Sequence, residues 1–253
     1  MLIFRSTPLR SVFARLLSQD CVLCGTRSHA SLCKDCYRDL PFRQVPGCPR
    51  CNAEGIKNQL CGACLSDPPH FDETRCAFRY AYPLDRLVQV YKFKAKLGLL
   101  PLFSNALAEA VRAGGSAPPD LVIPLPLAPK RLAQRGFNQA ALLGEHVSQM
   151  LATRFEVRGM LRVRETPPQT GLSRQARLKN VRGAFECIQR LDGKRVAVVD
   201  DVMTTGATLS EAAKALKKAG AAHVSAWVIA RAARDDISKD AVMETVPFDG
   251  MRN

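Results

Sequence analysis

The stretch VAVVDDVMTTGAT, residues 196–208, decides the fold of this chain. Its first half has the apolar composition of a strand that is buried on both faces, two acids follow, and a turn of small residues comes next. We expect a strand over Lys194–Asp200 and a helix over Thr208–Ala219 that ends at Gly220. A strand that leads through a short turn into a helix is the repeating unit of an α/β fold.

The turn in this stretch has the composition of a phosphate-binding site. Free backbone N–H groups and the helix dipole attract anions at the start of a helix, and threonine hydroxyls add donors. Carboxylates only accept hydrogen bonds, so the natural partners of Asp200 and Asp201 are sugar hydroxyls or a hydrated Mg²⁺. Together they predict a site for a ribose 5-phosphate, whose phosphate would contact Thr204, Thr205, Gly206, Ala207 and Thr208. The alternative is an ordinary helix start in which the acids and a capping box between Thr208 and Glu211 have no ligand.

The rest of the chain outside the cysteines alternates between strand and helix patterns. We expect further strands over residues 75–82, 120–125, 155–160 and 223–230. Helices are expected over residues 84–94 and 99–112, and from Asn138 as N-cap, with Leu143, Val147, Met150 and Leu151 on one face. The fold class is therefore α/β, with a mainly parallel sheet and flanking helices.

Two basic segments are candidates for holding a second anionic group. Residues 124–139 (PLPLAPKRLAQRGFNQ) follow an expected strand and place Lys130, Arg131 and Arg135 before a helix start, where arginines suit pyrophosphate. Residues 169–185 (QTGLSRQARLKNVRGAF) form a polar, basic loop in which Arg174 and Arg177 would close over a polyanion. The alternative for both segments is a solvated basic loop.

Eight of the ten cysteines form four Cys-x-x-Cys pairs near the N-terminus, and these are Cys21, Cys24, Cys33, Cys36, Cys48, Cys51, Cys61 and Cys64. Two such pairs complete a tetrahedral Cys₄ zinc site, which leaves no open position for a substrate. We therefore expect structural Zn²⁺. The sequence leaves open whether successive pairs or the first and third pairs share an ion, and His29 is an alternative ligand. Cys76 and Cys187 are expected to be small buried residues.

Composition adds limits on the class of protein. The 253 residues are 47% hydrophobic, which excludes a disordered or collagen-like chain. The net charge is +14, of which residues 81–190 contribute +10, a bias that favours nucleic acid, an anionic membrane surface or a phosphorylated small molecule as partner. No stretch is apolar enough for a membrane span, and arginines interrupt the N-terminal segment where a secretory signal would be apolar. We expect a cytoplasmic protein without membrane insertion, a compartment that disfavours disulfides.

These motifs, in this order, resemble those of the ComF family of type I phosphoribosyltransferase-like proteins. The resemblance rests on the cysteine pairs, RGFNQ at 135–139, QTGLS at 169–173 and VVDDVMTTGAT at 198–208. It implies a phosphoribosyltransferase fold behind a double zinc ribbon, and binding of phosphoribosyl pyrophosphate with Mg²⁺. It also implies a role in DNA uptake during natural competence, or in gluconate use in some members.

The same resemblance implies roles in a phosphoribosyl transfer to an acceptor that the sequence does not identify. Asp200 and Asp201 would contact the ribose hydroxyls and steady the ribose as positive charge develops. Arg131 and Arg135 would stabilise the departing pyrophosphate. We expect an N-terminal segment (1–19), a zinc-ribbon module (20–70), a phosphoribosyltransferase-like domain (71–231) and a polar tail (232–253).

Two other functions remain open at this stage. One is a factor that binds single-stranded DNA, with aromatic residues beside basic ones, namely Tyr91, Phe93 and Phe137, available to stack on bases. The other is a protein whose zinc ribbons dock onto a competence translocase.

Overall fold

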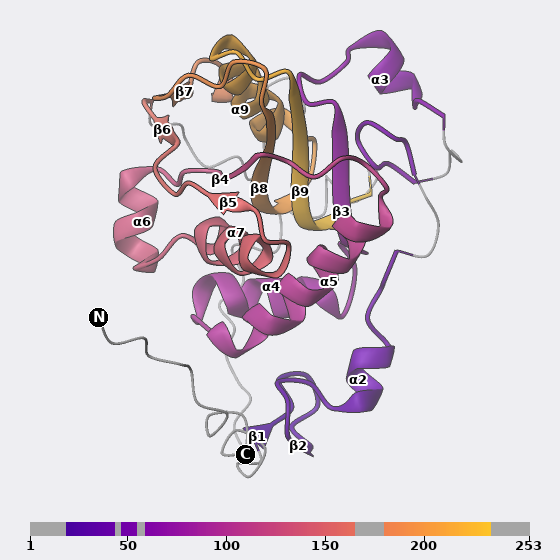
Figure 1. Ribbon diagram of the computed structural model, residues 1–253. Helices are drawn as coiled ribbons and strands as arrows, with labels where there is room; N and C mark the ends of the chain where they lie inside the picture. Colours follow the sequence, from indigo (N-terminus) through magenta and orange to yellow (C-terminus); the bar gives the residue numbers. More distant parts are fainter. Residues whose placement is uncertain (1–18, 44–46, 55–58, 165–179, 234–253) are drawn as a thin grey trace.

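A computed structural model describes residues 19–43, 47–54, 59–164 and 180–233 of the chain (Figure 1). Its centre is a sheet of five parallel strands, which are, in spatial order, β3 (Glu73–Arg79), β9 (His223–Arg231), β8 (Arg195–Met203), β4 (Leu121–Pro124) and β5 (Arg154–Phe155). Parallel strands need crossover connections, and helices supply them here. The α/β class predicted from the sequence is confirmed.

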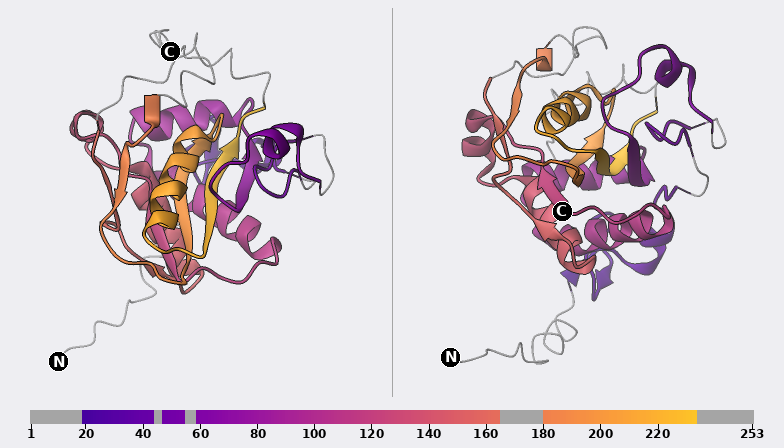
Figure 2. Two further views of the ribbon diagram at one scale, coloured as in Figure 1. Left: turned by 90° about the horizontal axis from the view of Figure 1, so that it is seen from above. Right: turned by 45° about the horizontal axis from the view of Figure 1, so that its top comes forward.

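Helices cover both faces of this sheet, as the views in Figure 2 also show. In the described ranges, the helices of the sheet domain with defined bounds are α4 (Leu84–Phe93), α5 (Leu100–Ala113), α6 (Pro129–Arg135), α7 (Gln139–Met150) and α9 (Ala207–Lys218), with the 3₁₀ turn η1 (Leu97–Leu99) before α5. On one face, α4, α5 and α7 pack together, whereas α9 lies on the other face. No helix in the described ranges is long and apolar enough to cross a lipid bilayer.

The continuous apolar run of β8 is explained by burial on both sides. Val196 and Val198 belong to the core beneath α9, whereas Ala197 and Val199 belong to the core beneath α4, α5 and α7. Successive side chains of a strand point to opposite faces, so a strand covered on both faces has no place for a polar residue until its end. The first polar residues of β8 after this run are Asp200 and Asp201, at the carboxyl end of the strand.

The cysteine-rich N-terminal region consists of two small units on opposite faces of the sheet (Figure 1). The first contains the hairpin β1 (Gln19–Asp20) and β2 (Arg27–Ser28) and the helix α2 (Lys34–Arg38), and its Cys21, Leu32 and Leu40 join the core of α4 and α5. The second contains α3 (Gly62–Ser66), and its four cysteines join the core of α9. Between the two units, Phe42 pairs antiparallel with Phe78 of β3.

Some expectations about local structure are wrong. The strand expected over residues 155–160 is two short strands, β5 and β6 (Met160–Arg162), of which β6 pairs antiparallel with β7 (Phe185–Cys187). A turn separates them, in which the Gly159 N–H donates to the Glu156 carbonyl at 3.3 Å. Met150 was expected on the buried face of α7, but it is exposed at the last turn, whereas Leu143 and Val147 are fully buried.

The capping box expected at the start of α9 does not form. The helix begins at Ala207, one residue before the predicted start, and its N-cap is Gly206, with no side-chain capping bond. The Glu211 carboxylate accepts instead from the Gly183 N–H at 2.8 Å. A tertiary contact with the segment before β7 therefore engages the Glu211 carboxylate, which the local sequence pattern predicted to bond at the start of the helix.

Candidate functional site

The candidate site is built at the carboxyl end of β8. The strand continues to Met203, beyond the predicted end at Asp200, because Val202 and Met203 still pair with β9. Asp200 and Asp201 therefore lie in regular strand and point to opposite faces of the sheet. Each carboxylate accepts the next N–H: the Asp201 N–H donates to Asp200 Oδ1 at 2.8 Å, and the Val202 N–H donates to Asp201 Oδ1 at 2.6 Å.

Lys92 of α4 is the nearest cation to this pair of acids among the ion pairs of the described residues. Its Nζ lies 2.9 Å from Asp201 Oδ1, and both side chains are largely buried, with exposed fractions of 20% and 12%. Sequence reasoning left Lys92 without a role. A signal existed, since Lys92 follows the buried Tyr91 and comes four residues after the buried Val88, at the edge of the apolar face of its helix.

Asp200 has an altered ionisation. Burial and the neighbouring Asp201 carboxylate raise the pKa of Asp200 to about 7, against the opposing effect of Lys92 and Arg135. Two carboxylates at adjacent positions of one strand end resist simultaneous ionisation, as in other paired acids. The protonation state of Asp200 can therefore change near neutral pH when a cation or a hydroxyl group binds beside it. Such a shifted ionisation is typical of functional sites.

The basic segment 124–139 supplies a second wall of the site. A short helix that sequence analysis did not predict, α6, carries Lys130, Arg131 and Arg135 directly after β4, the neighbour of β8. Arg135 is the member that the structure brings towards the acids: its guanidinium carbon lies 4.9 Å above the centre of the Phe93 ring, and it donates to Gln139 Oε1 at 3.2 Å. Lys130 is exposed on the first turn of α6.

The predicted phosphate turn occupies the gap between β8 and α9. Thr204, Thr205 and Gly206 form it, and Ala207 and Thr208 begin the helix. Gly206 has φ +81°, a left-handed conformation that suits glycine, and the Thr205 hydroxyl accepts from the Ala207 N–H at 3.2 Å. The start of α9 therefore follows the two acids closely in the chain.

Two of the predicted site residues, Arg174 and Arg177, lie outside the described residues. Of the remaining ones, the structure brings Asp200, Asp201 and Arg135 into one electrostatic group with Lys92. The turn residues follow these acids in the chain. Lys130 and Arg131 share a helix with Arg135 but belong to its opposite end.

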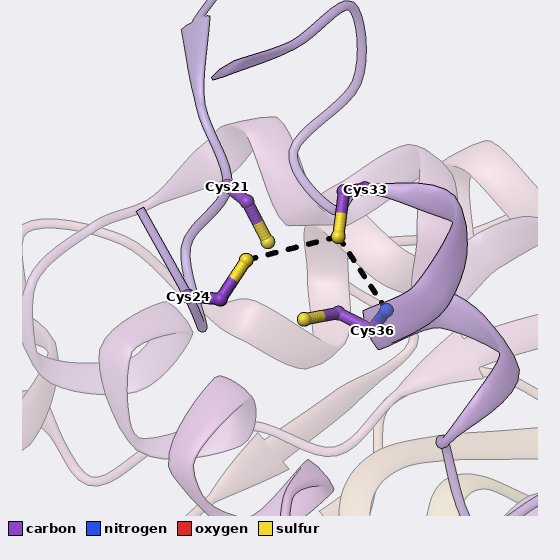
Figure 3. A group of neighbouring side chains, drawn as sticks. All are labelled: Cys21, Cys24, Cys33 and Cys36. Carbon is purple, nitrogen blue, oxygen red and sulfur yellow. Dashed lines mark hydrogen bonds between the residues drawn. The ribbon is translucent and has the colours of Figure 1, made fainter. Parts of the chain in front are cut away.

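The cysteines form two clusters, each from two successive pairs, which settles the pairing that the sequence left open. The first contains Cys21, Cys24, Cys33 and Cys36 (Figure 3), and the second contains Cys48, Cys51, Cys61 and Cys64. In each cluster the sulfur atoms all lie within 4.8 Å of one another; the Cys24 and Cys33 sulfurs are 3.7 Å apart, and the Cys51 and Cys61 sulfurs are 3.6 Å apart. Zn–S bonds of about 2.3 Å in a tetrahedron place sulfurs about 3.8 Å apart, so both clusters fit Zn²⁺.

The two clusters differ in their surroundings. All four cysteines of the second cluster are buried, whereas in the first only Cys21 is buried and Cys24 is exposed. Hydrogen bonds with Thr26 lower the pKa of Cys24 to about 6, which favours the thiolate that binds zinc. Neither cluster includes a histidine, and Cys76 and Cys187 belong to neither.

Comparison with protein families gives two matches. Residues 12–65 match the double zinc ribbon domain, and residues 140–248 match the phosphoribosyl transferase domain. Among solved structures, a purine phosphoribosyltransferase from Pyrococcus horikoshii Ot3 matches at 22% identity over 52% of this chain and 72% of that chain, with a TM-score of 0.35. The zinc-ribbon match spans both cysteine clusters, and the phosphoribosyl transferase match spans α7, β8 and α9.

Similar proteins cover most of the chain. The DNA utilization protein YhgH of Escherichia coli O6:H1 is 34% identical over 80% of this chain and 91% of its own length. Competence protein F of Haemophilus influenzae is 34% identical over 84% of this chain and 96% of its own length, and competence protein ComFC of Streptococcus pneumoniae is 29% identical over 79% and 87%. The chain is 34% identical to two of these relatives and covers 91% and 96% of their lengths, and it carries both a double zinc ribbon match and a phosphoribosyl transferase match. It therefore belongs to the ComF family.

Proposed function

We propose that this protein binds phosphoribosyl pyrophosphate together with Mg²⁺ at the carboxyl ends of β4 and β8. In this proposal the 5-phosphate contacts the turn Thr204–Thr208, and the ribose hydroxyls donate to Asp200 and Asp201. The pyrophosphate lies towards Arg131 and Arg135, with Lys130 at the edge of the site. Arg174 and Arg177, from the segment before β7, would complete the enclosure of the anion.

One observation carries this proposal: the acidic pair leads within three residues to the turn that opens α9. Acceptor groups for hydroxyls and a helix start for phosphate are therefore neighbours in the chain, a combination that suits a sugar phosphate. Lys92 supports the proposal, because it neutralises Asp201 where an anionic ligand must approach. A raised pKa such as that of Asp200, beside a helix start, is typical of functional sites rather than of an ordinary helix start.

The chemistry that this arrangement favours is substitution at ribose C1. The bond between C1 and the pyrophosphate oxygen breaks, the bond between C1 and an acceptor atom forms, and the acceptor loses a proton. The carboxylates of Asp200 and Asp201 would stabilise the positive charge that develops on the ribose, and Arg131 and Arg135 the charge on the departing pyrophosphate. Mg²⁺, bound with the substrate, would supply further charge neutralisation on the pyrophosphate oxygens.

Binding is tested by titration calorimetry with phosphoribosyl pyrophosphate and Mg²⁺, on full-length protein with its zinc bound. We expect Asp200→Asn/Asp201→Asn to lose detectable binding, and Lys92→Met to weaken it by about tenfold, since a charge-assisted contact is worth about 1.5–3 kcal/mol. Glu145→Gln, an exposed change on α7, is the matched control and should bind as the wild type does. Absence of binding to the wild-type protein would show that the proposed function is wrong.

We also propose that the protein acts in DNA uptake, a role that fits the names of its relatives, DNA utilization protein YhgH and competence protein F. The two zinc ribbons within residues 20–70 would then be an accessory module to the domain of residues 71–231, with a structural Zn²⁺ in each. Docking of this module onto a competence translocase is compatible with that role. A pull-down with full-length protein and a Leu65→Ser variant, altered at the most exposed leucine of the second unit, tests the docking.

A second candidate function is contact with single-stranded DNA, and one specific observation favours it. Of the three aromatic residues named from the sequence, Tyr91 is fully buried, whereas 58% of the Phe93 side chain is exposed. Lys94 and Lys96, both exposed, follow Phe93 in the chain, and Arg135 lies over its ring. An aromatic face among cations is the arrangement on which bases of single strands stack.

Fluorescence anisotropy with a labelled oligothymidylate at low salt tests this contact. We expect Phe93→Ala to weaken binding by about tenfold, since stacking of one base is worth about 1–3 kcal/mol. Tyr82→Ala is the matched control, because Tyr82 is a well-exposed aromatic residue before the opposite end of α4. Equal losses in both variants, or no binding by the wild-type protein, would contradict the candidate function.

A further inference from the structure

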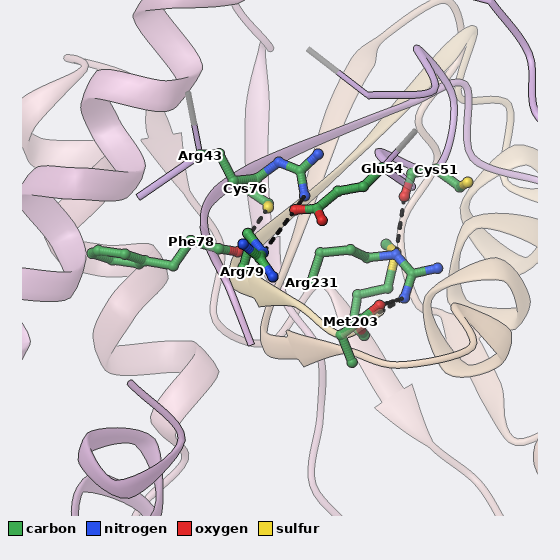
Figure 4. Close-up of polar contacts among 9 residues, drawn as sticks. Arg43, Cys51, Glu54, Cys76, Phe78, Arg79, Met203 and Arg231 are labelled. Carbon is green, nitrogen blue, oxygen red and sulfur yellow. Dashed lines mark hydrogen bonds and ion pairs between the residues drawn. The ribbon is translucent and has the colours of Figure 1, made fainter. Parts of the chain in front are cut away.

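A buried arginine joins the phosphate turn to the second cysteine cluster. Arg231, the last residue of β9, is only 5% exposed, and its Nε donates to the Cys51 carbonyl at 3.1 Å (Figure 4). One terminal nitrogen of the same guanidinium donates to the Met203 carbonyl at 3.1 Å, to the Ala232 carbonyl at 2.8 Å, and to the Thr204 carbonyl. One side chain thus holds both the first residue of the turn and a zinc-ligand residue.

Other contacts fix the second cysteine unit along β3, from Thr74 near the start of the strand to Arg79 at its end. The Thr74 hydroxyl on β3 donates to the Arg50 carbonyl at 2.7 Å, within the turn between Cys48 and Cys51. The Glu54 carboxylate lies 3.2 Å from a nitrogen of Arg43 and 3.2 Å from a nitrogen of Arg79 (Figure 4). The Cys51 carbonyl that accepts from Arg231 therefore belongs to a segment that packs against the sheet domain.

Apolar packing continues the connection towards α9. Met203 and Phe71 share one core cluster with all four cysteines of the second site. A Cβ atom on Gly206 would lie 3.6 Å from the Phe71 ring and 3.7 Å from the Met203 sulfur, so the turn packs directly on these two side chains. The first cysteine cluster does not belong to this core, because its Cys21 lies in the core on the opposite face of the sheet.

The energetics favour a specific coupling. A guanidinium presents a planar fork of donors, and removing it would leave buried carbonyl oxygens without that donor, at a cost for each group. A Zn²⁺ with four thiolates carries a charge of about −2, which favours a buried cation beside it. A metal bound by Cys51 would fix the backbone of that residue, and the hydrogen bonds of Arg231 would pass the constraint to Met203 and Thr204.

We propose that Arg231 is a positioning residue through which metal at the second cysteine cluster, and not at the first, holds the phosphate turn in its binding conformation. This inference rests on the proposed function for the role of the turn in ligand binding. The coupling between the second cysteine cluster, Arg231 and the turn does not depend on that role. Its consequence is that the two zinc sites have different tasks, because only the second one supports the ligand site.

Hydrogen exchange measured by mass spectrometry on the full, zinc-loaded chain without ligand tests the coupling. We expect Arg231→Met to accelerate exchange about tenfold or more in peptides that cover residues 203–209, while peptides from α4 and α5 keep wild-type rates. Arg79→Met is the matched control, since Arg79 contacts the same unit through Glu54 but does not touch the turn. Unchanged exchange in Arg231→Met, or equal acceleration in both variants, would overturn the proposal.

A second pair of variants decides the matter if Arg231→Met loses its overall fold. Cys64→Ser and Cys36→Ser each remove one ligand, and both residues lie in the short helices, α3 and α2, that complete their clusters. We expect Cys64→Ser to accelerate exchange in residues 203–209 and Cys36→Ser to leave it unchanged, with metal content measured for both. If both variants or neither affect these residues, the second cluster has no special connection with the turn.

Titration of the same variants with phosphoribosyl pyrophosphate and Mg²⁺ separates this inference from the proposed function. We expect Arg231→Met to bind about tenfold more weakly than the wild type, and Arg79→Met to bind equally well. A wild-type protein that binds no ligand would refute the proposed function, yet the exchange rates would still decide the coupling. A variant with accelerated exchange and full affinity would refute the positioning role of Arg231.

Discussion

At the scale of single residues, the site is a group of charges held out of water before any ligand arrives. Asp201 is 8% exposed and pairs with Lys92, whereas Asp200 has a pKa raised to about 7 by burial and by its neighbour. Burial of charge costs stability unless it is paired, so the arrangement weakens the folded state. Such a cost is typical of residues kept for function.

The ionisation of Asp200 predicts a pH dependence of stability. Because its folded pKa of about 7 lies above the unfolded value of about 3.9, its contribution is fully present below pH 4 and is lost as the pH rises through 7. Relative to Asp200→Asn, the wild type should lose about 1 kcal/mol of unfolding free energy between pH 6 and 8.5, as measured by urea denaturation. A difference in unfolding free energy between the wild type and Asp200→Asn that stays constant with pH would contradict this prediction. The same pH trend between the wild type and Glu145→Gln would contradict it too.

At the scale of elements, the connection between β8 and α9 determines where the acids and the helix start lie. Pairing with β9 extends β8 to Met203, and the chain then turns within three residues to enter α9. Gly206 makes that turn possible with a φ of +81°. The atoms nearest to a Cβ placed there belong to the Phe71 ring and the Met203 sulfur, at ordinary contact distance. The backbone conformation therefore limits which residues are tolerated at this position.

Gly206→Ala should therefore destabilise the protein through its backbone. We expect a loss of about 1–2 kcal/mol in the free energy of unfolding, because a left-handed conformation costs that much for an L-residue. Denaturation in urea measures the loss, and Gly62→Ala, in open space without a positive φ, should change stability by less than about 0.5 kcal/mol. Equal effects at the two glycines would mean that the conformation of Gly206 is not the cause.

At the scale of the whole molecule, the two zinc-ribbon units are bound to different parts of one sheet domain. The first lies on the side of α4 and α5 and the second on the side of α9, and residues 41–43 pass between them along the edge of β3 (Figure 1). The first cluster has an exposed and two half-buried cysteines, whereas the second lies wholly in the core. Metal in the two sites should therefore exchange with solvent at different rates.

Release of zinc to a coloured chelator should have two phases of equal amplitude. The fast phase belongs to the first cluster, since its sulfurs are accessible, and the slow phase requires opening of the core around the second. Cys36→Ser should show only the slow phase, and Cys64→Ser only the fast one, with a difference in rate of about tenfold or more. A single phase in the wild type, or loss of the slow phase in Cys36→Ser, would contradict this assignment.

Much of the candidate site could be predicted from the sequence because its motifs are short and involve residues close together in the chain. The spacing of the cysteine pairs, the two acids and the small-residue turn involve neighbours in the chain, whose geometry follows from chain connectivity. The predicted capping box is wrong because the Glu211 carboxylate accepts from the N–H of Gly183, which is 28 residues away in sequence. The strand end at Asp200 was wrong as well, because pairing with β9 extends the strand, and a local pattern does not contain that partner.

The α/β class, the eight cysteines of the zinc-ribbon units as a set, and the position of the phosphate turn between strand and helix follow from residue order alone. The pairing of the cysteines, the contact of Lys92 with Asp201, and the contact of Arg231 with Cys51 across 180 residues of chain follow only from the folded structure. The physical reason is that residue order sets short-range geometry, whereas contacts between distant segments depend on how the elements pack and on which buried polar groups then need partners.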